Sequence, residues 1–562
     1  PGRPAKAGVI AALIAAAGAE RVKDFPLAAS FYGEALRRFP EEPLTRTTGE
    51  TVSTWRHCYD ALDALIKNQG PAVYAKEEAL ARSRFEAAEK AGDVRGLRQV
   101  VDEFPNAGSA AEARLLLVRT LRTTDRPLDA LAAAQRELAR FGADEPAMVL
   151  EASLALEAAG FPASARDMLV CLKSRFGPRT LKLADGDAAT ADVYVSRRLA
   201  EPRFAALDAA TPPAIPLGAK IAWAEKTAGT SEAAGPELVA PRGQRPRSAD
   251  GYALVAAEGE LRALDLTNSA RTWRRPVRQA PSFPVWRDDR LYFAAGDAVI
   301  CLDPRDGSET WSVRLVEGAP LALEAAHGKI YLLVREAGGG RAVLLRSLDA
   351  ATGERLRDLR FPLTPVGGEG LPTTTGGASL EADSERLLVR LVGADRGAVI
   401  DGLTGAPLLG GFALRAATGV LPTLAPGGLL ALSPASGNLK SGERRIVGRR
   451  IGTQDDAWTW KADRVRGVTV ARKIGPAALL IALERDGVGG KIEKEVVLLD
   501  LEKGGVLLSK KLQTGEFVDA IAPGVLDGEL LLLSMRRSGS PGSVFVRAYD
   551  VVKDELKWES VP

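Results

Sequence analysis

Cysteine, histidine and methionine are scarce in this chain of 562 residues, with three, two and three copies. Cys58, Cys171 and Cys301 are odd in number and far apart, so they predict neither a disulfide framework nor a CxxC metal motif. His57 and His327 do not form a metal-binding pair either, which leaves no ligand set for zinc or haem. We therefore expect no metal site and no bound cofactor.

A charge excess of one sign is also missing, because 75 Lys and Arg residues face 72 Asp and Glu residues. Short basic clusters exist, such as Arg444 and Arg445, but strand-forming Ile446 and Val447 follow directly. Such a cluster is more typical of a solvated strand face than of a nucleic-acid site. The sequence therefore predicts no nucleic-acid partner.

Long hydrophobic runs are absent as well. The longest, Ala7 to Ala19, is shorter than the roughly 20 apolar residues that a membrane-spanning helix needs, so no transmembrane segment is predicted. Basic residues before this run and small residues within its end imitate a signal peptide, but the run also fits a helical repeat, which we favour. The chain opens with Pro1 instead of Met, which indicates a processed protein or a piece of a longer one.

What is present is a composition typical of folded proteins, with 46% hydrophobic and 26% charged residues. The length predicts two to four folded units, or fewer if one of them is a large repeat fold.

In the alanine-rich first 180 residues, one helix ending recurs and closes on a phenylalanine. Its four copies end at Phe39, Phe104, Phe141 and Phe176, at intervals of 65, 37 and 35 residues. A breaker containing Pro or Gly stands before each closing helix, at 23–26, 91–93, 124–127 and 160–162. A period near 35 is typical of helix-turn-helix repeats. We expect a stretch of irregular structure at 44–74, and we interpret His57 and Cys58 within it as structural residues, because helix neighbours point about 100° apart.

These hairpins resemble the tetratricopeptide family, in variants found in bacterial envelope lipoproteins and assembly factors. The resemblance implies a helical repeat domain over residues 1–180. Residues 181–216 lack a sustained period and predict a linker.

From residue 217 to 562, short strand-like runs alternate with Gly, Asp and Pro, and one phrase recurs: two strands, a tight turn opened by Asp, and a strand that often carries Trp. Its clearest copy is LYFAAGDAVICLDPRDGSETWSVRL, residues 291–315. The turn aspartates are Asp265, Asp303, Asp349, Asp401, Asp500 and Asp550, and the predicted docking tryptophans are Trp273, Trp311 and Trp558. We expect Asp and Gly to form the turns and Trp to cover the seam between units.

Some copies of the phrase are degenerate. We expect Leu356, Leu408 and Leu507 to replace tryptophan, and the interval of 99 residues between Asp401 and Asp500 implies one hidden copy. We place its turn at Asp455 or Asp456. The count is then seven units of propeller-blade size, with Trp223 as a closing strand or the remnant of an eighth.

The phrase resembles PQQ-like β-propeller repeats, as found in quinoprotein dehydrogenases and in BamB of the outer-membrane β-barrel assembly machinery. The resemblance implies an α + β multidomain fold, with a helical-hairpin (TPR-like) solenoid followed by an all-β propeller of seven or eight four-stranded blades. Quinoprotein dehydrogenases are similar to one another in a pair of adjacent cysteines and a set of calcium ligands. No two cysteines are adjacent in this sequence, and the calcium ligands cannot be mapped onto it. The turn aspartates recur in nearly every copy, so we interpret them as turn-formers and predict no catalytic residue.

No GxSxG, HExxH, EF-hand or P-loop pattern occurs, and we expect no enzyme. Both predicted architectures expose extended surfaces, a helical groove and a propeller face. The leading hypothesis is a non-catalytic scaffold or assembly subunit of a bacterial complex in the periplasm or cell envelope, with other proteins bound at these surfaces. Two alternatives stay open: a quinoprotein-like, PQQ-dependent oxidoreductase and a ligand-sensing propeller.

Overall fold

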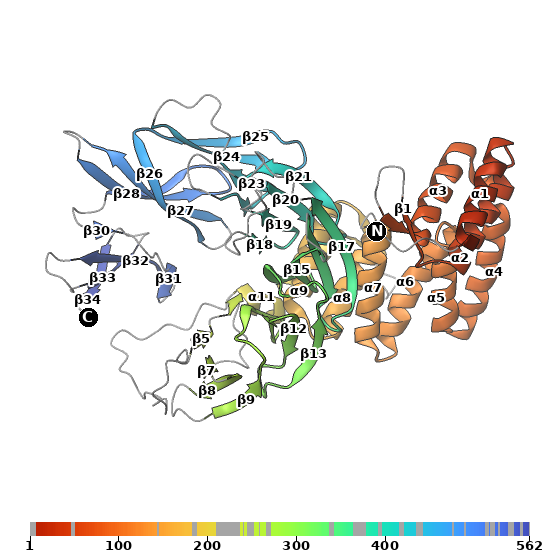
Figure 1. Cartoon of the computed structure of the whole chain (residues 1–562), viewed down its shortest axis with the longest axis horizontal. Coiled ribbons are helices and arrows are strands. Elements are labelled where there is room, and N and C mark those ends of the chain that lie inside the picture. Colours follow the sequence, from red (N-terminus) through yellow and green to blue (C-terminus); the bar gives the residue numbers. More distant parts are fainter. Residues whose placement is uncertain are drawn as a thin grey trace. The chain divides into compact units, whose positions relative to one another are not determined.

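The structure is a computed structural model, and the chain divides into two compact units, Pro1–Ala159 and Gly160–Pro562, which are described separately (Figure 1). The residues that it describes are 7–45, 51–142, 145–182, 188–208, 237–239, 241–243, 252–257, 259–265, 271–336, 342–362, 378–391, 396–414, 421–433, 442–474, 477–487, 491–511, 516–517, 523–526, 529–537, 544–550 and 555–560.

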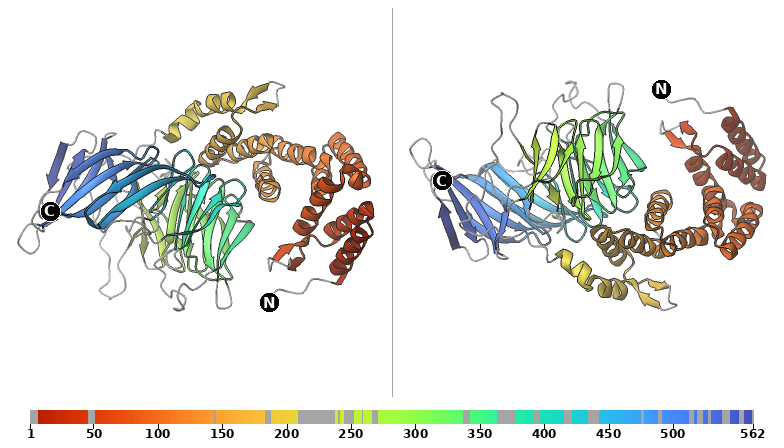
Figure 2. Two further views of the ribbon diagram at one scale, coloured as in Figure 1. Left: turned by 90° about the horizontal axis from the view of Figure 1, so that it is seen from above. Right: turned by 90° about the horizontal axis from the view of Figure 1, so that it is seen from below.

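The first unit is helical, and each helix packs against its neighbours in the chain (Figure 2). Its helices are α1 (Ala7–Arg21), α2 (Phe25–Arg38), α3 (Thr54–Gln69), the 3-10 helix η1 (Pro71–Tyr74), α4 (Ala75–Ala91), α5 (Val94–Glu103), α6 (Gly108–Thr123), α7 (Pro127–Phe141) and α8 (Pro146–Ala158). Fully buried alanines, such as Ala28 and Ala130, let neighbouring helices approach closely. The predicted apolar run from Ala7 to Ala19 lies within α1.

The helices of this unit begin and end at the breakers that the sequence indicates. Asp24 caps α2 by accepting the backbone N–H of Leu27 at 3.2 Å, and Asp93 caps α5 through the N–H of Arg95 at 2.9 Å. The recurring phenylalanines stand at the other ends: Phe39 and Phe104 follow the last residues of α2 and α5, and Phe141 is the last residue of α7. The repeated ending therefore marks the close of a helix, as predicted.

The stretch at 44–74 interrupts the hairpin pattern, as expected. It contains a small antiparallel hairpin, β1 (Pro43–Thr45) with β2 (Thr51–Ser53), followed by α3 and η1. Cys58 on α3 is buried, and burial raises the pKa of its thiol to about 12. A thiol in this environment is a packing residue and not a nucleophile.

The second unit opens with helices before its sheets begin. These are α9 (Pro162–Phe176), α10 (Ala191–Leu199) and α11 (Pro202–Asp208), with the hairpin β3 (Thr180–Lys182) and β4 (Ala188–Thr190) between α9 and α10. The described part of the predicted linker, 181–216, thus includes β4, α10 and α11. Both α10 and α11 pack against α9.

Seven mainly antiparallel sheets follow in chain order within the described residues, most with four strands (Figure 1). Sheet 1 has β5 (Glu237–Val239), β7 (Tyr252–Ala257), β8 (Glu260–Asp265) and β9 (Arg271–Pro276), and sheet 2 has β10 (Ser282–Arg287), β11 (Arg290–Ala295), β12 (Ala298–Leu302) and β13 (Glu309–Arg314), with β6 (Arg242–Gly243) at its edge. Sheet 3 has β14 (Ala322–Ala326), β15 (Lys329–Arg335), β16 (Ala342–Asp349) and β17 (Arg355–Pro362), and sheet 4 has β18 (Ala378–Ala382), β19 (Arg386–Leu391), β20 (Arg396–Asp401) and β21 (Pro407–Ala413). Sheet 5 has β22 (Thr423–Ala425), β23 (Leu429–Leu432), β24 (Arg444–Arg450) and β25 (Asp456–Ala462); sheet 6 has β26 (Val465–Ile474), β27 (Ala478–Asp486), β28 (Ile492–Asp500) and β29 (Val506–Lys511); and sheet 7 has β30 (Glu516–Phe517), β31 (Pro523–Leu526), β32 (Glu529–Arg537), β33 (Val544–Asp550) and β34 (Glu555–Ser560).

Neighbouring sheets pack on one another through apolar faces. Separate buried clusters join sheet 1 to sheet 2, sheet 3 to sheet 4, sheet 4 to sheet 5 and sheet 5 to sheet 6. The first strands β10, β14, β18 and β22 lie next to one another in succession. The core of this unit therefore lies between sheets, so the turns at the strand ends remain available for other roles.

Candidate functional site

The predicted turn aspartates whose side chains are described bond to their own turns. Asp349 is the fullest case: its Oδ1 accepts the backbone N–H groups of Ala351 and Thr352, both at 2.9 Å, and the hydroxyl of Thr352 at 3.1 Å. Asp303, Asp401 and Asp500 accept backbone N–H groups two or three residues ahead in the same way. Asp265 and Asp550 end strands β8 and β33, but their side chains lie outside the described residues.

The predicted docking tryptophans cover the turn of the next sheet. The indole Nε1 of Trp273 donates to the carbonyl of Pro304 at 2.9 Å, and that of Trp311 donates to Ala350 at 3.0 Å. Gly307 has a φ of 70°, and a Cβ there would lie 2.5 Å from the ring of Trp273, so this turn needs glycine for its backbone and for space. The side chain of Trp558 lies outside the described residues.

Trp458 on β25 has the same role, which the sequence interpretation missed. Its Nε1 donates to Leu501 at 3.1 Å, and its ring lies against Gly504 in the turn of sheet 6. The spacing between turn and tryptophan could have predicted this role. Trp273 and Trp311 each stand eight residues after a turn aspartate, which makes the residue eight positions before Trp458 the expected turn position.

The prediction of Asp455 or Asp456 as the hidden turn is wrong. Each turn of this type within the described residues has two backbone hydrogen bonds, and in sheet 5 they run from Arg450 N to Asp455 O and from Gln454 N to Arg450 O, both at 2.8 Å. Arg450 therefore holds the aspartate position, and Gln454, with a φ of 63°, holds the glycine position. Because arginine stands where the other described turns have aspartate, the aspartate pattern does not mark this turn.

The expected leucine replacements are also displaced by one residue. Eight positions after Asp349 stands Arg357, whose Nη1 donates to Thr404 O in the turn of sheet 4 at 3.0 Å. Eight positions after Asp401 stands Leu409, which packs on the buried cluster between sheets 4 and 5. A cation with a hydrogen bond or an aliphatic side chain can thus replace tryptophan at this seam.

Helix α9 contacts the first turns of sheets 2, 3 and 4, through Asp288, the backbone of His327 and Ser384. At its N-terminus, the Asp288 carboxylate accepts the N–H groups of Ala163 and Ser164 at 2.7 and 3.1 Å and the hydroxyl of Ser164 at 2.5 Å. Asp288 belongs to the β10–β11 turn, so an element more than 120 residues away in sequence caps this helix. The carboxylate supplies the cap that Phe161, at the N-cap position, cannot.

Further along α9, Asp167 pairs with Arg287, Cys171 contacts Ser384 O at 3.2 Å, and Arg175 forms a 2.8 Å ion pair with Asp401. Desolvation raises the pKa of Asp167 to about 7 in spite of Arg287. The turn aspartate Asp401 therefore has two tasks, since it forms its own turn and holds α9.

Buried polar groups of sheet 3 complete this junction. Lys329 Nζ donates to the carbonyls of Gly402 and Leu403 at 2.8 and 2.5 Å, and burial lowers its pKa to about 8. His327 hydrogen-bonds through its ring nitrogens to Tyr331 and to Asp383 O, and burial lowers its pKa to about 3. These contacts give His327 a structural environment, as a neutral imidazole in a satisfied network.

A second polar cluster links the first strands of three sheets. The Glu381 carboxylate on β18 accepts from Arg390, from Thr423 on β22 at 2.7 Å and from Lys473 on β26 at 2.8 Å. Burial lowers the pKa of Lys473 to about 8. All of these groups are engaged with one another, so the cluster stabilises the contact between sheets.

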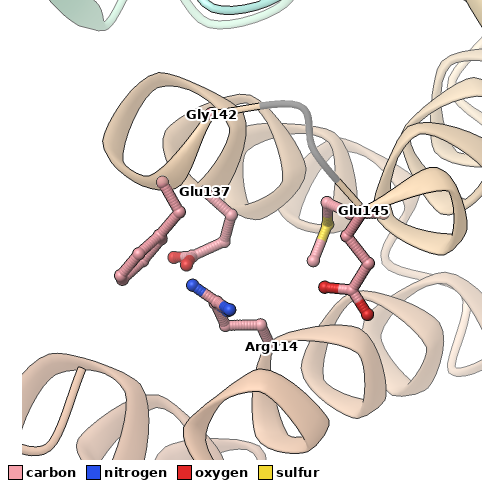
Figure 3. A pocket seen from close by; sticks show the side chains of 6 residues that line it. Arg114, Glu137, Gly142 and Glu145 are labelled. Atoms are coloured by element: carbon pink, nitrogen blue, oxygen red, sulfur yellow. The ribbon is translucent and has the colours of Figure 1, made fainter. Parts of the chain in front are cut away.

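The helical unit contains an open pocket of about 210 Å³ (Figure 3). It is lined by Arg114 on α6, Glu137 and Phe141 on α7, Gly142, Glu145, and Met148 on α8. In Figure 3, Glu137 and Arg114 point toward each other, and Glu145 approaches from the side of α8. The pocket thus gathers acidic, basic and apolar side chains from three consecutive helices.

The pocket's charged groups are incompletely satisfied. The Arg114 guanidinium lies over the ring of Phe141, 3.9 Å from its centroid. Glu137 is only 4% exposed, and its Oε2 accepts no hydrogen bond from the described residues. Burial raises the pKa of Glu137 to about 7 and also raises the pKa of Glu145, although Arg114 opposes both changes.

Comparisons with known proteins concern mainly the second unit. Residues 257–442 match the family described as "Outer membrane protein assembly factor BamB". Apart from the edge strand β6, this BamB-like segment includes sheets 2, 3 and 4 and the turns at Asp303, Asp349 and Asp401, so the predicted resemblance to PQQ-like, BamB-like propeller repeats is confirmed for it. A helical region precedes it, as expected.

Among solved structures, BamB from Moraxella catarrhalis is 15% identical, with 58% of this chain and 92% of that one covered and a TM-score of 0.34. The quinohemoprotein alcohol dehydrogenase from Comamonas testosteroni is 14% identical, with coverages of 56% and 66% and a TM-score of 0.34. The computationally designed protein Ika8 is 15% identical, with coverages of 57% and 85% and a TM-score of 0.36. A comparison with curated proteins finds no match. These similarities are too distant to assign a function.

Proposed function

We propose that this chain is a non-catalytic scaffold, an assembly subunit that holds other proteins in a bacterial complex of the periplasm or cell envelope. In this proposal the helical unit is a TPR-like solenoid, and the sheets of the second unit are the seven blades of a β-propeller. The observation that carries the proposal is the joining of BamB-like repeats, named for an assembly factor, to a row of helical hairpins in one chain.

The use of the polar residues supports this reading. Asp303, Asp349, Asp401 and Asp500 bond their own turn backbones, and the buried ionisable groups beneath α9 hold that helix in place. Recurring residues that are engaged in this way act in folding. The strand-end turns and the pocket of the helical unit remain as surfaces for partners.

The proposed location rests on the BamB-like segment alone. No helix in the described part of the chain combines the length and apolar character that crossing a membrane requires.

Affinity purification of the tagged full chain from its source cells, after chemical cross-linking, tests the proposal. Mixing the lysate with isotope-labelled, untagged cells separates partners bound in the cell from proteins bound after lysis. We expect stoichiometric proteins with cross-links to residues 1–180 or 217–562. A chain recovered without protein partners and carrying a quinone would overturn the proposal in favour of an oxidoreductase.

A further inference from the structure

Among the described residues that line the pocket of the helical unit, carboxylates outnumber guanidinium groups by one. Two carboxylates, Glu137 and Glu145, line it with a single guanidinium, that of Arg114. Arg140 also influences Glu137, but its own charge is balanced by Asp102 at 2.7 Å. One cation entering the pocket would therefore equalise the charges.

Glu137 has a specific need for a donor. A carboxylate that is 4% exposed has lost most of its water, and its Oε2 has no hydrogen-bond donor among the described residues. Buried polar atoms are almost always hydrogen-bonded, because an unmade hydrogen bond costs free energy. An ammonium group at this oxygen would supply the missing donor and a compensating charge.

The remaining lining fits an aliphatic stem. Phe141 and Met148 give the pocket apolar walls, and methionine adapts its shape to a flexible ligand. The volume of about 210 Å³ is several times the roughly 30 Å³ that one water occupies in the liquid. Arg114 already lies against the ring of Phe141, so a compact ammonium fits better than a second planar guanidinium.

We propose that this pocket binds a lysine side chain of a partner protein, with the ammonium group at Glu137 and Glu145 and the stem against Phe141 and Met148. This inference rests on the proposed scaffold function, and it adds the chemistry by which the helical unit would recognise a partner.

Binding should strengthen as pH rises through neutrality. Burial raises the pKa of Glu137 to about 7, so the carboxylate gains its full charge only above that pH. The charged groups that influence it are Arg114 on α6, Arg136 and Arg140 on α7, and Asp102 on α5. Of these groups only Asp102 is a carboxylate, and it forms an ion pair with Arg140 at 2.7 Å.

Methyl NMR of the full chain tests the pocket directly, because the sequence contains only three methionines. Met148 lines the pocket, whereas Met168 is buried on α9 and Met535 lies on β32, so the last two serve as internal controls. With ¹³C-methyl methionine, n-butylammonium at pH 8 and constant ionic strength should shift Met148 saturably and leave Met168 and Met535 unmoved.

Variants and a second probe make the assignment specific. Glu137→Gln should weaken n-butylammonium binding by roughly tenfold, the scale of a lost charge-assisted hydrogen bond. Glu86→Gln changes the net charge equally, but Glu86 is an exposed residue of α4 outside the pocket lining, so its binding should be unchanged. Lowering the pH to 6 should weaken binding to the unmodified chain.

Two results would overturn the inference: a shift of Met148 by n-butyrate without one by n-butylammonium, which would mark an anion site at Arg114, or no saturable shift by either probe. Both are read from the unmodified chain, so they do not depend on how a variant folds. Neither bears on the recovery of cross-linked partners, so this inference can fail while the scaffold proposal stands.

Discussion

At the scale of single residues, the turn of sheet 5 keeps its backbone geometry without the residues that stabilise it elsewhere. Arg450 stands where the four other described turns have aspartate, and Gln454 adopts a φ of 63° where they have glycine. Ile451 of this turn packs in the buried cluster between sheets 4 and 5, and its N–H donates to the Gly428 carbonyl at 3.0 Å, so these contacts hold the turn in place. Its own sequence is therefore suboptimal.

Replacing Arg450 with aspartate should stabilise the protein. A carboxylate there could accept the N–H groups of Gly452 and Thr453, as Asp349 does for Ala351 and Thr352, and a capping bond of this kind contributes about 1 kcal/mol. Chemical denaturation should show a higher unfolding midpoint for Arg450→Asp than for Arg450→Ala, the control that removes the same side chain. Equal midpoints would contradict the assignment of position 450 as the turn position.

Glu137 should make the helical unit less stable as pH rises. Its folded pKa of about 7 lies above its usual value of 4.5, so the folded state binds the extra proton; the stability from this group is complete below pH 4.5 and is lost as pH rises through 7. Hydrogen exchange of α7 should therefore quicken between about pH 5 and pH 8 beyond the intrinsic rate change. Glu137→Gln should remove this extra acceleration, and Glu86→Gln should keep it.

At the scale of elements, α9 shows what the sequence could and could not predict. Its start at Pro162 and its end at Phe176 follow from a local breaker and the repeated ending. Its cap, Asp288, lies in a turn between β10 and β11, and no local pattern connects two segments so far apart. Distant pairings of this kind belong to tertiary packing.

Removing the Asp288 carboxylate should loosen α9. Asp288→Ala leaves the N–H groups of Ala163 and Ser164 without their acceptor in a buried place, which costs about 1–3 kcal/mol. Hydrogen exchange across residues 162–176 should rise several-fold. Asp289→Ala changes the exposed neighbour in the same turn and should leave α9 protected; equal effects of the two substitutions would show that the cap contributes little.

At the scale of the whole molecule, the periods of the sequence identified the helical half, the strand-rich half and most repeat turns. The turn of sheet 5 was not predicted because it has the backbone hydrogen bonds of the other described turns but lacks their aspartate. The pocket at Glu137 was not predicted because it is assembled from three helices, and only the three-dimensional structure shows that Glu137 Oε2 has no donor among the described residues. Sequence periods therefore predict architecture better than they predict sites.

The two-unit division also predicts how fragments should behave. A fragment that begins at residue 160 keeps α9, with its ion pairs to Asp401 and Arg287, whereas one that begins at residue 217 exposes the buried polar groups beneath that helix. Thermal denaturation should show a cooperative transition for 160–562 and a lower or broader one for 217–562. Equal transitions would show that α9 is dispensable for the sheets.

We propose that this chain holds proteins together and does not catalyse a reaction. Native mass spectrometry of the endogenous chain, isolated gently from its source cells, tests it most directly. The expected result is a defined assembly that contains this chain and at least one other protein in fixed ratio. A lone chain with the added mass of a quinone and calcium would contradict it.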